Sequence, residues 1–144
     1  MRRVKNPVTG QMVVQDFFTN IASVDSLAAG ASQSVNVNID ADSEFVLLKM
    51  AYFADIAGAA QTEGTQVVPL VTVELVDSGS GRYLQSAPVP IDSTAGRGEL
   101  PFVLPVPRSF SPNSTIRVTF TNYSNATTYT NLKLAMIGYK EFKV

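Results

Sequence analysis

Strict alternation of apolar and polar residues near the carboxyl end of the chain, from Ser114 to Val144, is the feature that most constrains its fold. The segments 116–120 (Ile-Arg-Val-Thr-Phe) and 132–136 (Leu-Lys-Leu-Ala-Met) each carry a large apolar residue at every second position. In a β-strand a period of two places these residues on one face. That face has to be buried against a second layer, so the pattern predicts a sheet protein with at least two layers.

The composition narrows the chemistry that such a protein can perform. The chain has 144 residues, with no histidine and no cysteine. The two side chains that most often carry acid–base, nucleophilic and transition-metal chemistry are therefore missing, and a disulfide framework is excluded. The length fits one domain. Only 16% of the residues are charged, against roughly 25% in soluble domains, and this favours a surface that partly meets other protein.

Charge is distributed unevenly between the amino terminus and the rest of the chain. The first five residues hold three cations, whereas the remainder holds eight basic against twelve acidic residues. A proline and a glycine close by discourage regular structure. We therefore predict a basic arm over residues 1–11 and a single domain over residues 12–144. The arm is either a solvated terminus or a segment that docks on a neighbouring subunit. Because no aromatic residue interleaves its cations, it does not predict nucleic-acid binding. Those cations are Arg2, Arg3 and Lys5.

Turn residues divide the remaining chain into short segments. The segment 45–53 is almost continuously apolar, which fits a strand covered on both faces or a short buried helix, and we favour the strand. A hairpin turn is predicted over residues 77–81. Residues 107–113 are predicted to form a rigid, proline-rich connection, and 54–64 a loop of small residues. The other predicted strands are 12–23, 34–39, 67–76 with Pro69 at an edge or bulge, 82–84, and 100–106 broken by Pro101 and Pro105.

About eight strands and no confident helix leave three architectures: a jelly roll, an immunoglobulin-like sandwich and a closed barrel. The immunoglobulin-like sandwich lacks its usual cysteine pair and tryptophan here. Up-and-down barrels join most strands by tight hairpins, whereas the connections here are long and irregular. The prediction is therefore an all-β, antiparallel β-sandwich of about eight strands, with the jelly roll preferred.

No arrangement of residues predicts a catalytic, cofactor or metal site. Asp40, Asp42 and Glu44 alternate as in a calcium loop, but the glycine and terminal glutamate of that loop are absent, and turn-forming carboxylates are the simpler account. Asp77, which precedes Ser78-Gly79, is predicted to form an Asx-turn. Carboxylate pairs for glycoside hydrolysis could be drawn without any specificity. They could come from Asp55, Glu63, Glu74 and Asp92.

Three aromatic residues have two possible roles. Tyr123, Tyr129 and Phe110 could form an exposed surface of the kind found in sugar-binding modules, or they could cover the ends of the core. Three sequons for N-glycosylation begin at Asn113, Asn122 and Asn125, and we interpret them as turn asparagines.

One stretch of the chain resembles a known class of proteins. The run 104–122 (Leu-Pro-Val-Pro-Arg-Ser-Phe-Ser-Pro-Asn-Ser-Thr-Ile-Arg-Val-Thr-Phe-Thr-Asn), followed by 132–140, looks like the carboxyl-terminal half of small virion proteins of tailed bacteriophages. The length and the strand number are similar to those of the jelly-roll cement, or decoration, proteins that clamp the outside of phage heads. The resemblance implies a non-enzymatic subunit that binds the major capsid protein in many copies.

These observations define the expected function and partners. We expect a capsid cement protein on the virion surface, made in the host cytoplasm and associating as a dimer or trimer. No membrane span is expected, because no apolar run approaches roughly 20 residues. The alternatives are a head–tail connector or fibre component, a carbohydrate-binding module, and an enzyme that uses carboxylates alone. No cofactor is expected. The predicted contact residues are Arg2, Arg3, Lys5, Arg108 and Phe110.

Overall fold

The protein is built almost entirely of β-strands, as the alternating pattern predicts. The computed structural model describes residues 2–5, 9–58, 67–98 and 100–143. In chain order the elements are β1 (Arg2–Lys5), β2 (Met12–Leu27), β3 (Ser32–Asn38), β4 (Glu44–Ile56), β5 (Val71–Asp77), β6 (Arg82–Tyr83), β7 (Val89–Pro90), the short helix α1 (Ile91–Thr94), β8 (Phe102–Phe110), β9 (Thr115–Asn122) and β10 (Tyr129–Lys143).

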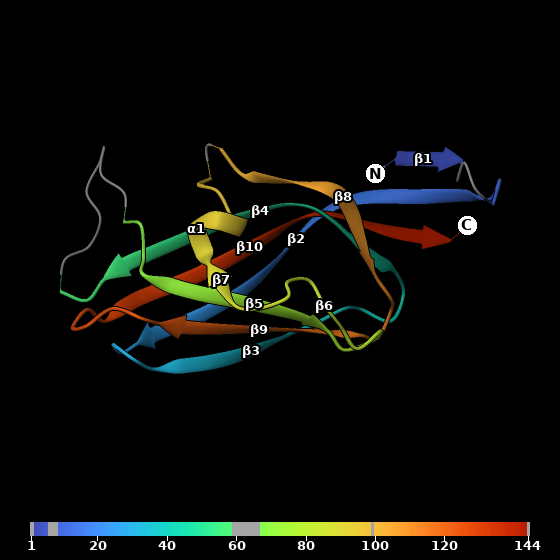
Figure 1. The fold of residues 1–144 in the computed structure, drawn as a ribbon. Helices are drawn as coiled ribbons and strands as arrows, with labels where there is room; N and C mark the ends of the chain where they lie inside the picture. The colour runs from blue at the N-terminus through green and yellow to red at the C-terminus, as the bar shows by residue number, and fades with distance from the viewer. Residues whose placement is uncertain (1, 6–8, 59–66, 99, 144) are drawn as a thin grey trace.

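The strands form two antiparallel sheets that pack face to face (Figure 1). Sheet A has the order β1-β2-β10-β4-β8. Sheet B has the order β3-β9-β5-β6, and β7 also pairs with β5. In Figure 1, β1 and the adjoining ends of β2 and β10 extend past the end of sheet B. The predicted all-β sandwich is confirmed.

The pairing order identifies the sandwich as a jelly roll. Strand β2 pairs with β10, β3 with β9, β4 with β8, and β5 with β6 and β7. These nested pairs describe one long hairpin rolled up so that successive pairs fall alternately in sheet A and sheet B. Two four-stranded sheets connected in this way are the jelly-roll arrangement. Strand β1 is an addition to the edge of sheet A.

The two alternating segments that dominate the sequence face each other across the core. Strand β9 lies in sheet B and β10 in sheet A, so residues 123–128 cross from one sheet to the other. Each fully buried large apolar side chain contributes roughly 1.5–3 kcal/mol to folding. The largest are Phe45, Phe110, Phe120, Leu27, Leu47, Leu75, Ile91, Ile116, Leu132, Leu134 and Met136.

A buried amide fixes the crossing between the sheets. Asn122 is fully buried, and its Nδ2 donates to the carbonyl oxygens of Leu27 and Thr127 at 3.0 and 2.8 Å. Its Oδ1 accepts hydrogen bonds from the backbone N–H and the hydroxyl of Ser124. Because every polar atom of the amide is paired, its burial is not costly. The burial also leaves no room for a glycan on this sequon.

The prediction of a strand over 100–106 followed by a rigid connection over 107–113 is wrong, because one strand, β8, covers most of both segments. The strand begins at Phe102 and continues through Pro105 and Pro107 to Phe110. Leu47 pairs with Arg108 and Lys49 with Val103, so residues 104–107 bulge out opposite a single residue of β4. Prolines are tolerated here because β8 is an edge strand and the bulged residues make no ladder hydrogen bonds.

Three other predictions need adjustment. Residues 2–5 are not irregular, because β1 pairs with residues 12–15 of β2. The strand predicted over 67–76 begins at Val71, and residues 67–70 precede it without strand structure. Of the loop predicted over 54–64, residues 54–56 end β4, whereas 59–64 lie outside the described residues.

Candidate functional site

The outward faces of the two sheets differ sharply in polarity. In sheet B the hydroxyl oxygens of Ser32 and Thr121 lie 2.8 Å apart, and those of Ser34 and Thr119 lie 2.9 Å apart. These residues are direct cross-strand neighbours on β3 and β9. Such pairs of hydroxyl groups are what a solvated sheet face carries. The outward face of sheet B is therefore suited to water.

Sheet A carries large apolar side chains where sheet B carries hydroxyl groups. Phe17 is 75% exposed, Val103 60%, Ile21 51% and Phe53 46%. Isolated exposed apolar residues are normal, but neighbouring ones mark contact surfaces. We use the term apolar face for the outward side chains of Phe17, Ile21, Phe53, Val103, Ile137 and Tyr139.

The strand register shows that these residues are neighbours. Phe17 lies beside Tyr139 on β10, Thr19 beside Ile137, and Ile21 beside Ala135. Opposite residues of antiparallel strands share a face, with Cβ atoms about 4.5–5.5 Å apart. On the other side of β10, Lys133 lies beside Phe53 and Ile137 beside Lys49, which in turn lies beside Val103 of β8. The apolar face therefore spans four strands.

Charged residues border the apolar face unequally at its two ends. Lys133 lies at one end, whereas Glu141 pairs with Glu44 at the other. Arg2 of β1 stands opposite Gln15 in the same region, and its Nη2 donates to Gln15 Oε1 at 2.6 Å. The result is a basic end and an acidic end, with Lys49 and the apolar side chains between them.

Tyr139 reports the environment at the acidic end. Burial raises the pKa of its hydroxyl above the ordinary value of 10.0, the Glu141 carboxylate raises the pKa further, and the Arg2 guanidinium lowers it. A raised pKa means that the neutral phenol is favoured, as expected for a partly desolvated site next to a negative charge.

The predicted contact residues of the arm lie on the edge of sheet A. Arg2, Arg3 and Lys5 are all exposed on β1. Among the described strands β1 pairs only with β2, so it forms the edge of sheet A. The structure therefore gathers these three cations on one short strand beside the acidic end of the apolar face.

Phe110 does not belong to an exposed contact surface, whereas Arg108 is partly exposed. Phe110 is fully buried and stacks against Phe45 with 6.4 Å between ring centroids. Arg108 lies over the Phe110 ring and forms an ion pair with Asp77, with 3.6 Å between Nη2 and Oδ2. The prediction that Phe110 contacts a partner is corrected, because its parity on β8 directs the ring into the core.

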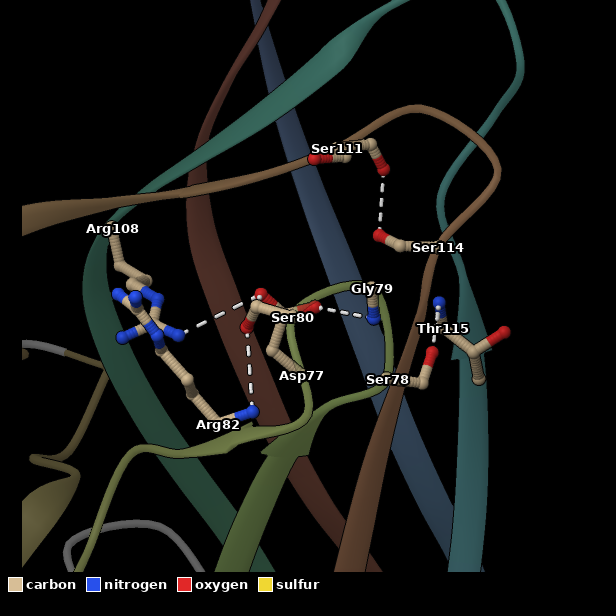
Figure 2. Close-up of polar contacts among 9 residues, drawn as sticks. All are labelled: Asp77, Ser78, Gly79, Ser80, Arg82, Arg108, Ser111, Ser114 and Thr115. Atoms are coloured by element: carbon tan, nitrogen blue, oxygen red, sulfur yellow. Dashed lines mark hydrogen bonds and ion pairs between the residues drawn. The ribbon is translucent and has the colours of Figure 1, made fainter.

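Asp77 organises the turn between β5 and β6 (Figure 2). Its Oδ1 accepts a hydrogen bond from the backbone N–H of Gly79 at 2.9 Å, and its Oδ2 accepts one from the hydroxyl of Ser80 at 2.9 Å. Ser78 Oγ accepts from the backbone N–H of Thr115 at 2.8 Å, which ties the turn to β9. The Asx-turn prediction is confirmed, and this polar cluster is structural.

The other residues considered for chemistry are dispersed or occupied. Asp40 forms an ion pair with Lys140 at 2.5 Å, and Asp42 accepts a hydrogen bond from Ser43. Among the residues that the structure describes, no three His, Cys, Asp or Glu side chains gather to hold a metal ion. Glu63 lies outside the described residues. Tyr129 is buried, with its hydroxyl accepting from the Leu70 N–H, so no shared platform forms with Tyr123.

A groove of about 380 Å³ lies beside the bulge of β8. Its lining is mostly apolar, and its charged group, Arg108, is the one paired with Asp77. The lining residues that the structure describes therefore offer a hydrophobic wall, and none of them is positioned for acid–base or nucleophilic work.

The apolar face was not predicted from the sequence, although a signal for it exists. Phe17 and Phe18 are adjacent, so a strand has to direct one of them to each face. Phe18 receives the Lys140 ammonium over its ring at 4.1 Å, whereas Phe17 is left outward. A bulky apolar pair inside an otherwise alternating strand indicates that both faces of the strand avoid water.

Comparisons with known proteins add no assignment. Searches of protein-family models, curated proteins and solved structures found no match. Within the described ranges, no helix is long and apolar enough to cross a membrane.

Proposed function

We propose that this protein is a non-catalytic structural subunit that works by protein–protein contact, as a cement protein bound to the major capsid protein on the head of a tailed bacteriophage. The observation that carries the proposal is the difference between the two outward faces. One face of the sandwich is lined with paired hydroxyl groups, and the other exposes an apolar surface across four strands.

The physical reason lies in the cost of hydrating the apolar face. Each Å² of apolar surface removed from water contributes roughly 25 cal/mol. Phe17 and Val103 are more than half exposed, so covering them with another protein is favourable. If the outward faces of both sheets met water, polar residues would occupy these positions. The polar face of sheet B is the side that remains in solvent.

The virion setting is supported by the resemblance of segments 104–122 and 132–140 to small phage virion proteins. The jelly-roll order of the strands fits the same class. The cations of β1 provide a second means of attachment, because Arg2, Arg3 and Lys5 are exposed on the edge strand of sheet A. Contacts of this kind steer association and weaken as salt rises.

The experiment is a co-sedimentation assay with phage heads that lack the protein. The wild-type chain is expected to pellet with the heads and to saturate at a fixed ratio to the major capsid protein. Phe17→Ser should reduce occupancy at least tenfold, and the matched control Arg117→Ser, an exposed position on the polar face of sheet B, should bind like the wild type. Failure of the wild-type protein to bind heads at any concentration would reject the virion assignment.

A further inference from the structure

The outward residues of β10 form a pattern that is complementary to its own reverse. In order along the strand they are Lys133, Ala135, Ile137, Tyr139 and Glu141. Reading the strand backwards exchanges the positive end with the negative end and the small side chain with the large one. Ile137 remains at the centre.

We infer that the apolar face packs against the same face of a second copy of this chain, with the two β10 strands antiparallel across a two-fold axis near Ile137. The inference rests on the proposed function, in which this face is a protein contact surface, and it names the occupant. A two-fold axis makes the interface isologous, so that every contact occurs twice.

The register then defines which side chains meet. Lys133 of one copy lies opposite the partner's Glu141, and Ala135 opposite the partner's Tyr139. Strand β2 lies beside β10 in each copy, so the two β2 strands also face each other. Phe17 then lies opposite the partner's Ile21. The two charge pairs sit at the ends of the interface, and its middle is apolar apart from Lys49 of each copy, which approximates the apolar core and polar rim of protein interfaces.

The charges favour this orientation over the parallel one. It brings Lys49 of each copy together near the two-fold axis, whereas the parallel orientation would place like charges opposite one another at both ends of β10. If the two β10 strands ran parallel, Lys133 would face the partner's Lys133 and Glu141 the partner's Glu141. Like charges placed opposite one another cost several kcal/mol in an interface. The outward face of sheet B offers no comparable surface, because Ser34 and Thr119 pair their hydroxyl groups with each other.

The size of the apolar face is appropriate for a dimer. From Lys133 to Glu141 the strand extends about 27 Å, and four strands are about 20 Å wide, given a rise of about 3.4 Å per residue and a strand spacing of about 4.8 Å. The projected area is about 500 Å². The accessible surface is larger than this projection, because side chains protrude from the sheet. It is of the order of the roughly 800 Å² that each partner buries in a standard interface.

Charge reversal tests the orientation directly. We expect Lys133→Glu and Glu141→Lys each to raise the dimer dissociation constant at least tenfold, measured by sedimentation velocity. An equimolar mixture of the two variants should form a heterodimer with near wild-type affinity, because one copy then carries a carboxylate at both ends of the interface and the other an ammonium group at both ends. The double variant K133E/E141K should dimerise alone. Arg117→Glu, a reversal on the polar face of sheet B, is the matched control and should leave the constant unchanged.

The outcomes separate the dimer from the proposed function. A wild-type chain that stays monomeric overturns the dimer, as does a mixture that dimerises no better than the single variants. If the wild-type chain is monomeric and heads bind it but not Phe17→Ser, the face binds the capsid protein directly and the proposed function stands without the dimer. If the chain dimerises as described but never binds heads, the dimer stands and the virion function fails. Circular dichroism of each variant confirms that it is folded.

Discussion

Arg108 on β8 of sheet A and Asp77 on β5 of sheet B form an ion pair that joins the two sheets of the sandwich, with 3.6 Å between Nη2 and Oδ2 (Figure 2). The Asp77 carboxylate is almost fully buried and also accepts two hydrogen bonds from the turn that follows it. One carboxylate thus closes the β5–β6 turn and holds the edge strand β8 against the other sheet.

Asp77→Ala is expected to lower the free energy of unfolding by about 2–3 kcal/mol, because it removes two hydrogen bonds and leaves Arg108 without its carboxylate. Urea denaturation monitored by circular dichroism measures the change. Asp92→Ala, at an exposed position of α1, is the control and should have little effect. An equal loss of stability in both variants would contradict the stabilising role of the contacts that Asp77 makes.

Gly138→Ala should destabilise the fold by about 3 kcal/mol, as overpacking of a tight site does. A Cβ at Gly138 would lie 1.8 Å from the carbonyl oxygen of Val46, a backbone atom that cannot move away freely. The site coincides with a shift in register between β10 and β4. Gly98→Ala is the matched control, because an added Cβ there meets nothing within 4 Å. Thermal unfolding of both variants distinguishes close packing from a general effect of losing glycine.

The raised pKa of Tyr139 predicts that the protein loses stability at alkaline pH. Burial and then Glu141 raise the pKa of Tyr139 in the folded state above 10.0. The folded chain therefore holds this proton more tightly than the unfolded chain does. The resulting stability is fully present below pH 10 and is lost as the pH rises through the folded-state pKa.

Substitution isolates the contribution of Tyr139. In Tyr139→Phe, the loss of stability above pH 10 should be smaller than in the wild type, as measured by urea denaturation at a series of pH values. A Tyr52→Phe background removes a second tyrosine whose pKa burial raises. Identical alkaline profiles with and without Tyr139 would contradict the prediction.

Deletion of residues 1–8 should lower the melting temperature by only a few degrees. The three cations of β1 are exposed and the strand adds a short ladder at the sheet edge, so the expected loss is about 1 kcal/mol. Head attachment should weaken more, and its salt dependence should decrease, because the cations are lost. Differential scanning calorimetry and the co-sedimentation assay measure the two effects. A collapse in melting temperature would mean instead that β1 is essential to the fold.

Lys49→Gln should strengthen self-association. Lys49 shares a row with Ile137 on the outward face of sheet A, so in the inferred dimer it approaches the partner's Lys49 near the two-fold axis. Removing this repulsion is expected to lower the dimer dissociation constant severalfold, as measured by sedimentation velocity. Weaker association would place the axis elsewhere on the sheet.

The architecture was largely predictable because strand formation leaves a local trace. The segments 116–120 and 132–136 alternate with a period of two, and the structure buries their apolar residues on facing sheets. The long, irregular connections between most strands correctly favoured a jelly roll over an up-and-down barrel. The turn role of Asp77 was also predictable, because an Asx-turn needs only neighbouring residues.

The tertiary structure decided the features that depend on distant pairing. Pro105 and Pro107 interrupt a strand in sequence, but a place at the sheet edge and a bulge opposite β4 accommodate them. Phe110 is part of the core because of its parity on that edge strand. Phe17 and Tyr139 become neighbours only when residues far apart in the chain pair in register. Alternation along one strand determines which residues share a face, whereas the partners of that strand determine whether the face meets the core, water or another protein.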